Sequence, residues 1–448
     1  MGLEISIEWL TLIMFGSLLV LLMAGLPLAF VTGGLACVFL FVLGDSWQVL
    51  NIVPSRIFPL MTNYQLSAIP LFIFMAAMLE RAGIINDMFD VIYKVLGGVR
   101  GGLAAATIIA STILAAMVGV IGAAVVTMGI IALPAMLQRN YNPEIAMGSI
   151  MVGGTLGILI PPSILAIIYA VVAEQSVGEL FIGAVFPGLL LSGLYVLYVI
   201  VRCIINPELG PAAPIKERIS FIEKVRILSR TSAPIALIVV VLGVIFSGVA
   251  TPVEAAGIGT SGAFIAAAIH CKLDWATIQA ACLTTLEASA MVIWIMFGAT
   301  IFVGLYVLEG GQQFVSELMQ GLGLGLWGIL ILMQIILIFL GMFLDWVGIL
   351  LLCVPIFVPI VKALGATSFG LDNPDDLVLL YLVNMQMSFL SPPFGYALFY
   401  LRGVAPPEIP MIRIFKAAIP FLAIQIIGLV LCMVFPEIII WLPRLVYG

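Results

Sequence analysis

A pair of prolines interrupts an apolar run in this chain and limits what that run can fold into. The run covers residues 145–173, long enough to cross a bilayer as a helix, but Pro161-Pro162 and three glycines lie near its centre. A helix must bend or open there, because proline has no amide hydrogen and clashes with the preceding turn. Backbone groups freed inside hydrocarbon are tolerated only against protein or a wet cavity. The break therefore indicates either a binding site at membrane depth or a packing kink.

A second interruption of the same kind lies in the other half of the chain. Pro392-Pro393 follows Pro161-Pro162 after about half the length of the chain, again inside an apolar run. Interrupted apolar segments at corresponding places in two halves are typical of transporter binding sites. Superposing the two proline pairs also matches Leu159 with Leu390, Ala166 with Ala397 and Tyr169 with Tyr400.

The composition assigns the chain to a class of proteins. Hydrophobic residues make up 63% and charged residues 9%, with a mean hydropathy of +1.28, whereas a soluble protein carries about 25% charge. The chain is therefore a multi-pass membrane protein surrounded by lipid, and no basic tract suggests nucleic acid as a partner. An intramembrane enzyme is not expected, since there is no HExxH motif, no pair of intramembrane aspartates and only one histidine, His270.

The apolar segments follow one order that occurs twice: three spans, a hairpin of two short arms, a broken helix and a last span. This order predicts an all-α polytopic fold of two repeats, with two re-entrant helical hairpins and two discontinuous helices. Five crossings per repeat would invert the second copy relative to the first. The expected boundaries are residues 1–205 for the first repeat, with its hairpin at about 103–137 and its broken helix at about 145–173, and residues 232–448 for the second, with its hairpin at about 325–361 and its broken helix at about 377–404.

Residues 206–231 form the clearly hydrophilic connection between the two repeats. Together with the preceding Arg202, this linker holds a large share of the basic residues of the chain. Short loops rich in Lys and Arg stay in the cytoplasm, so we expect the linker inside and both termini outside. The basic residues concerned are Arg202, Lys216, Arg218, Lys224, Arg226 and Arg230.

Several longer motifs lie in both halves of the chain: Gly153-Gly154-Thr155-Leu156-Gly157-Ile158-Leu159-Ile160-Pro161-Pro162-Ser163, Phe343-Leu344-Asp345, Val354-Pro355-Ile356-Phe357-Val358-Pro359, Ser391-Pro392-Pro393-Phe394-Gly395 and Trp441-Leu442-Pro443-Arg444-Leu445. Through these motifs the chain resembles, over nearly its whole length, the DctM-type large membrane subunit of TRAP (tripartite ATP-independent periplasmic) transporters. One departure is the first hairpin tip, residues 122–127, which is apolar where relatives often carry Ser or Asp.

The resemblance implies more than the residues show by themselves. It implies a subunit of the bacterial inner membrane that works with a small four-helix membrane subunit and a periplasmic substrate-binding protein. It also implies the ion-transporter superfamily fold, an elevator movement, and transport driven by a sodium gradient without ATP. No resident cofactor is expected, only coupling sodium ions.

Sodium is a hard cation that prefers several oxygen ligands, and carbonyl groups exposed at helix breaks can supply them. We expect one ion where the first hairpin tip meets the first break, and a second where the tip around Asp345 meets the second break. An acid at membrane depth is usually functional, but Asp345 could also simply cap the arm that follows it. The candidate residues are Gly119, Gly122 and Thr127 facing Gly153, Gly154 and Thr155, and Asp345, Trp346 and Gly348 facing Ser388 and Ser391.

The solute is expected at the two breaks, where half-helix N-termini aim amides at a carboxylate. Arg402 could attract an anionic solute, or it could anchor the end of its helix. The candidate solute-binding residues are Gly153, Gly154, Thr155, Pro161, Pro162, Ser391, Pro392, Pro393 and Arg402.

The resemblance implies an organic acid as the solute: a C4-dicarboxylate, a sugar acid such as sialic acid, or a 2-oxo acid. The segments at 388–395 and 400–407 look like a branch paired with binding proteins for 2-oxo or hydroxy monocarboxylates. The alternative function is a stand-alone ion-coupled carboxylate carrier of the same superfamily, which needs no binding protein.

Overall fold

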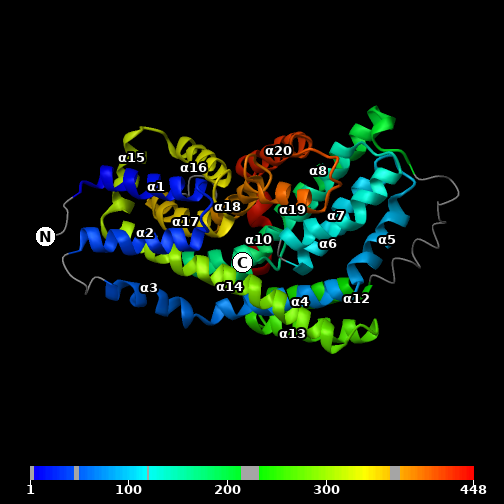
Figure 1. Cartoon of the computed structure of the whole chain (residues 1–448), viewed down its shortest axis with the longest axis horizontal. Helices are drawn as coiled ribbons and strands as arrows, with labels where there is room; N and C mark the ends of the chain where they lie inside the picture. The colour runs from blue at the N-terminus through cyan, green and yellow to red at the C-terminus, as the bar shows by residue number, and fades with distance from the viewer. Residues whose placement is uncertain (1–4, 45–49, 119–120, 213–231, 364–373, 448) are drawn as a thin grey trace.

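The structure is a computed structural model that describes residues 5–44, 50–118, 121–212, 232–363 and 374–447. The described residues form helices and connecting turns, without a strand among them. The molecule is elongated, with α1, α2, α16 and α17 at one end, α5 to α8 at the other, and α14 running between them (Figure 1). The all-α expectation is confirmed for the described part of the chain.

The first half begins with two apolar helices, a bent pair and an amphipathic helix, and continues with a hairpin, a broken helix and a long span. The α3–α4 pair bends by 59°. These elements are α1 (Ile7–Met23), α2 (Leu28–Leu43), α3 (Ile52–Met61), α4 (Ala68–Arg81), α5 (Ile84–Leu96), α6 (Gly102–Val118), α7 (Ile121–Gln138), α8 (Pro143–Thr155), α9 (Ile164–Ala173) and α10 (Val177–Ile205).

The second half follows a matching order, with the continuous α14 in place of the bent pair and one extra helix at the end. Its elements are α12 (Ser232–Phe246), α13 (Pro252–Ile269), α14 (Trp275–Leu308), α15 (Gly311–Gly321), α16 (Leu326–Gly341), α17 (Trp346–Ala363), α18 (Pro374–Ser388), α19 (Tyr396–Val404), α20 (Met411–Val434) and α21 (Glu437–Tyr447). The division into two repeats and their inversion about an axis in the membrane plane stay predictions.

Both proline-containing segments are interrupted. In the first half, α8 ends at Thr155, a single 3₁₀ turn covers Leu156–Ile158, and α9 begins only at Ile164. The side chain of Ser163 accepts a hydrogen bond from the amide of Ala166 at 3.3 Å and so caps α9. In the second half, residues 389–395 separate α18 from α19.

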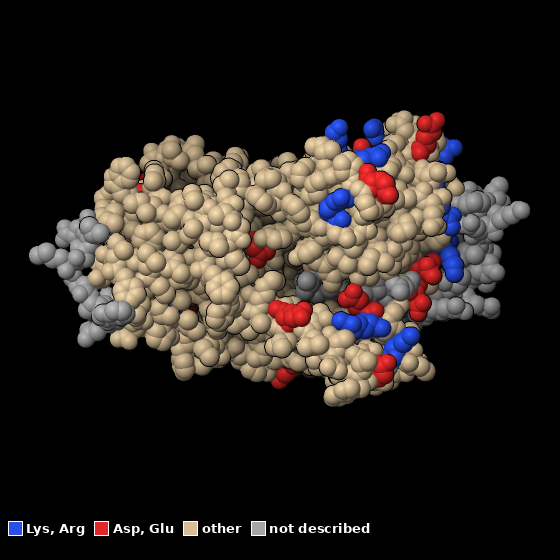
Figure 2. All heavy atoms as spheres, in the orientation of Figure 1, with Lys and Arg blue, Asp and Glu red and all other residues tan. Residues whose placement is uncertain are grey.

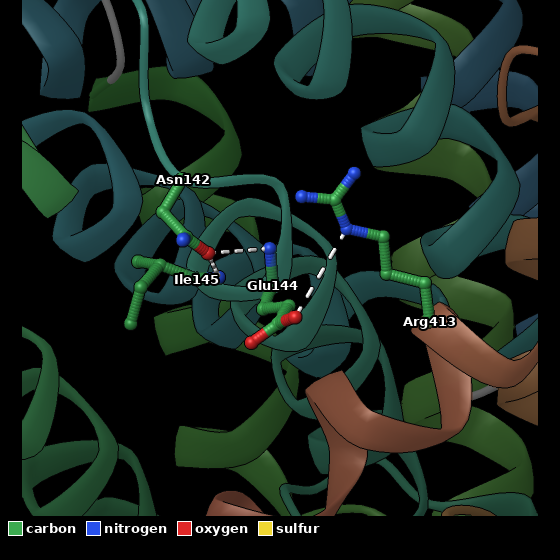
Figure 3. Close-up of polar contacts among 4 residues, drawn as sticks. All are labelled: Asn142, Glu144, Ile145 and Arg413. Carbon is green, nitrogen blue, oxygen red and sulfur yellow. Dashed lines mark hydrogen bonds and ion pairs between the residues drawn. The ribbon is translucent and has the colours of Figure 1, made fainter. Parts of the chain in front are cut away.

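Local sequence explains where α8 begins. The side-chain oxygen of Asn142 accepts hydrogen bonds from the amides of Glu144 and Ile145 at 2.8 and 3.3 Å (Figure 3). Pro143 takes the first helical position, where a missing amide hydrogen costs nothing. Glu144 also lies 4.0 Å from the guanidinium of Arg413, which links the start of α8 to α20. Such a half-exposed ion pair contributes little to stability, so the cap is the main reason for this boundary.

Five described helices are long and apolar enough to cross a membrane, and the bent α3–α4 pair is a sixth candidate; the five are α7, α10, α13, α14 and α20. Two boundaries have a local cause. The long helix α14 begins at Trp275, where Asp274 caps it through the amide of Thr277 at 2.7 Å. The last expected span of the second repeat is two helices in place of one, because α20 ends at Val434 and Pro436 precedes α21.

The hairpin arms are not as short as a re-entrant hairpin would suggest. The arms α6 and α7 have 17 and 18 residues, and α16 and α17 have 16 and 18. Since α7 meets the length needed to cross, the re-entrant character of the hairpins stays a prediction.

The charged side chains gather at one end of the molecule. On the face shown in Figure 2, Lys and Arg cluster at the end formed by α5 and the start of α8, while the opposite end shows none. The guanidinium of Arg139 lies 4.8 Å from the ring of Tyr93 on α5, so this charge is held against the apolar body. By the positive-inside rule we expect this end in the cytoplasm. Most of the predicted linker lies outside the described residues.

Candidate functional site

Both hairpin tips and both helix breaks line one cavity of about 350 Å³. Segments far apart in the sequence therefore converge at one place in the molecule. The start of α2 and the middle of α14 complete its wall. The residues concerned are Ile121 and Gly122 of the first tip, Ile158 and Ile164 beside the first break, Asp345 and Trp346 of the second tip, Phe389, Tyr396 and Tyr400 around the second break, residues 27–30, and Met291, Trp294 and Ile295.

Asp345 is the one charged residue among the described residues that line this cavity. Its carboxylate accepts hydrogen bonds from the amides of Trp346 and Val347, at the N-terminus of α17. Its Oδ2 atom is buried and has no hydrogen-bond partner among the described residues. The side chain therefore caps α17 and also keeps one acceptor oxygen free, so the two roles expected for it are compatible.

A second cavity of about 430 Å³ adjoins the first and shares Asp345, Tyr396, Pro27 and Leu28 with it. The turn between α1 and α2 forms one wall, and Gly25 in that turn has φ +86°, a conformation that favours glycine. Asp345 thus lies at the boundary of two spaces, each large enough for a small solute.

Aromatic rings form much of the cavity wall on the side of the second break. The ring centroids of Tyr396 and Tyr400 are 6.5 Å apart, and those of Phe389 and Tyr396 are 6.3 Å apart. The ring of Tyr400 packs on Gly122, where an added Cβ would lie 3.1 Å from it. Glycine at 122 therefore lets the first hairpin tip approach the second broken helix.

The other candidates in the first half lie at helix contacts instead of the cavity. A Cβ on Gly153 would lie 2.6 Å from Cβ of Ser111 on α6, and one on Gly154 would overlap Val125 on α7. Thr155 donates to the carbonyl of Val152 at 3.0 Å. Thr127 donates to Oε1 of Glu80 on α4 at 2.7 Å. Pro161 and Pro162 are buried in the break itself, and Gly119 lies outside the described residues.

The second half shows the same division. Gly348 packs on Leu28, and Ser388 packs on Gly341 of α16. Ser391 donates to the carbonyl of Met387 at 2.8 Å, and neither Pro392 nor Pro393 lines the two cavities. Arg402 donates to the carbonyls of Ile409 at 2.8 Å and Pro406 at 3.4 Å, an arrangement that suits an anchor better than an anion site. Gly122, Asp345 and Trp346 are thus the candidates that reach the main cavity.

Sequence reasoning missed the tyrosines at 396 and 400, Trp294 and the α1–α2 turn as cavity walls. It also missed a buried amide pair, in which Nδ2 of Asn384 donates to the backbone carbonyl and Oε1 of Gln334 at 3.0 and 2.5 Å. Only Tyr400 carried a signal, since it matches Tyr169 when the proline pairs are superposed.

The donor set restricts the cations that this site could hold. Among the described residues, no group of three or more His, Cys, Asp and Glu could hold a metal ion. The free Asp345 oxygen and the tyrosine hydroxyls are hard oxygen donors. Oxygen donors suit alkali and alkaline-earth cations, whereas thiolate and imidazole donors would favour transition metals.

The family model and the curated relatives agree on one family. The family model described as "Tripartite ATP-independent periplasmic transporter, DctM component" matches residues 15–438. The C4-dicarboxylate TRAP transporter large permease protein DctM of Pseudomonas aeruginosa is 32% identical over 390 residues, which cover 87% of this chain and 88% of that one. Its counterpart in Rhodobacter capsulatus is 31% identical, with 97% and 99% covered. The crystal structure of the Alcanivorax borkumensis YdaH transporter shares the fold at 14% identity, with a TM-score of 0.61 and 95% and 99% covered.

Proposed function

The chain belongs to the family of DctM components of TRAP transporters, and from this premise we propose that it takes up an organic acid by sodium symport. Members of this family are large permease subunits for solute uptake and not enzymes. In the proposal, a periplasmic binding protein delivers the solute, a small four-helix membrane subunit assembles with the permease, and the sodium gradient supplies the energy without ATP.

The observation that carries the proposal is the convergence of both hairpin tips and both breaks on the cavity at Asp345. Interrupted helices at membrane depth present backbone groups to an ion or polar solute. A free carboxylate oxygen beside those breaks can bind a cation, and the cation can in turn hold an anionic solute. This arrangement would couple the two species, since neither binds as well alone.

Helix packing supports an elevator movement. The helices α2, α4, α13 and α14 pack on one another, and a second group consists of both hairpins, both broken helices, α10 and α20. The cavity lies between the groups, since α2 and α14 form one wall and the tips and breaks form the other. Sliding the second group past the first would carry a solute held at the tips and breaks, while α2 and α14 stay in place.

Uptake by proteoliposomes tests the proposal. The permease, its small subunit and the binding protein would be reconstituted, and uptake of the solute bound by that protein would be measured with an inward sodium gradient. We expect uptake to require sodium, and we expect little uptake when the binding protein is omitted.

Two controls separate the alternatives. Equal uptake with potassium in place of sodium, in the presence of a proton gradient, would contradict sodium coupling. Full uptake without the binding protein would favour the alternative, a stand-alone ion-coupled carboxylate carrier.

A further inference from the structure

We infer that the main cavity selects organic acids with a single negative charge and an apolar body, and that it discriminates against dicarboxylates. The inference rests on the proposed function, because it takes this cavity as the place that receives the transported solute. It goes beyond that function by naming a charge class that the names of the most similar relatives do not suggest, since these are C4-dicarboxylate permeases.

The first argument is the fixed charge of the cavity. Asp345 contributes a carboxylate, and no Lys, Arg or His is found among the described residues that line the wall. Arg402, which follows the second break, is bound to the carbonyls of Pro406 and Ile409 and does not line the cavity. Each solute carboxylate therefore adds to an existing negative charge, and only sodium ions that enter with it can offset the repulsion.

The second argument is the supply of hydrogen-bond donors. The side chains that can donate into the cavity are the hydroxyls of Tyr396 and Tyr400 and the indoles of Trp294 and Trp346. The tyrosines lie close together, with ring centroids 6.5 Å apart. The two hydroxyls can donate hydrogen bonds to one carboxylate, whereas the remaining wall is largely aliphatic and aromatic. A second carboxylate against that wall would lose its water without gaining a side-chain donor, which is unfavourable.

The third argument is size. At about 350 Å³ the cavity is at the lower end of the range for ligand sites. A small solute would fill it and contact several walls at once. A second charge would then meet either the apolar wall or the adjoining cavity, where Asp345 is again the one charged residue among the described residues of the lining.

The test uses three probes of equal chain length: butyrate, succinate and 4-aminobutyrate. Each would be titrated against the purified permease–small subunit complex in sodium buffer, with tryptophan fluorescence as the readout. Trp346→Phe and Trp294→Phe would show that the signal comes from the cavity. We expect butyrate to bind at least about tenfold more tightly than succinate.

Asp345→Asn then tests whether the fixed charge causes the preference for butyrate. Removing the fixed charge should lower the ratio of the succinate dissociation constant to the butyrate dissociation constant by at least about threefold. The matched control is Glu287→Gln on α14, an acid that does not line the cavity although Ala288 and Met291 beside it do; it should leave the ratio unchanged. Misfolding alone would weaken both probes together and would not change their ratio.

Three results would overturn the inference: equal or tighter binding of succinate, a ratio that Asp345→Asn does not change, or no binding of any probe at the cavity. Tighter binding of 4-aminobutyrate, lost in Asp345→Asn, would also overturn it and would show that the acid holds an organic cation. The proposed function is tested separately by sodium-driven uptake, so binding in the expected order without such uptake would reject the transport proposal and keep the charge preference.

Discussion

The two hairpins contact their broken helices in different ways. In the first half, α6 approaches α8 so closely that Ser111 lies against Gly153, and the contact depends on shape. In the second half, α16 packs on α18 through the Gln334–Asn384 amide pair, and Ser388 packs on Gly341 as well. Close approach at a glycine therefore occurs in both halves, and the second half adds a pair of buried amides.

This difference also separates the chemistry of the two halves. The second hairpin brings Asp345 to the cavity, whereas the described tip of the first brings the apolar Ile121 and Gly122. Buried polar groups are expensive in a low-dielectric interior unless they are paired or bind something. We conclude that the first half serves mainly as a closely fitting wall and that the second half carries the fixed charge.

The largest effect is expected where the first half depends on shape. Gly154→Leu would drive a side chain into Val125, whose backbone nitrogen already lies 3.1 Å from the position of a Cβ. Overpacking of this kind costs up to about 3 kcal/mol, and more where the backbone must move. We expect loss of the assembled peak in size-exclusion chromatography. The matched control is Gly257→Leu on α13, where a Cβ meets nothing within 4 Å; similar behaviour of both variants would refute the close-contact argument.

The next effect tests the charge of the second half. Asp345→Asn should keep the cap on α17, since Asn caps helices about as well as Asp, but it removes the charge facing the cavity. We expect uptake at a low sodium concentration to fall at least about tenfold, with half-maximal uptake requiring more sodium. Measurement of uptake against sodium concentration at matched expression decides this, and overlapping curves would leave Asp345 as a cap alone.

A smaller effect concerns the amide pair. Asn384→Leu or Gln334→Leu alone would leave the other amide buried without its side-chain partner, which costs about 1–3 kcal/mol. The double substitution should be more stable than the sum of the single effects predicts, because no amide is then left unpaired. Thermal unfolding of the detergent-solubilised variants measures this coupling. Strict additivity would show that the pair does not hold α16 to α18.

The smallest effect is expected at the contact between α7 and α4. Thr127→Val keeps the shape of the side chain but removes its hydrogen bond to Glu80, for a loss of about 1 kcal/mol. Because this bond joins the first hairpin to the opposing group of helices, the variant should change transport rate more than stability. Paired measurements of initial uptake rate and thermal unfolding would check this, and a purely stability-related change would contradict it.

The sequence by itself determined the membrane class, the two helix breaks and several helix boundaries. These properties are local. A proline removes its own amide hydrogen wherever the segment lies, and Asn142 caps α8 through amides two and three residues away. The repeated break also located the site to within a few residues, since Ile158, Ile164 and Phe389 beside the breaks line the cavity.

The tertiary structure alone decided which side chains face the cavity. Gly153, Gly154 and Ser388, which the sequence offers as ligands, lie at helix contacts, whereas Tyr396 and Trp294 line the cavity. The physical reason is that these helices are apolar on every side, so no periodic polar face indicates how each one is turned. The rotation of each helix about its axis follows from packing between segments that are hundreds of residues apart, such as α2 against α14. That packing cannot be inferred from one segment alone.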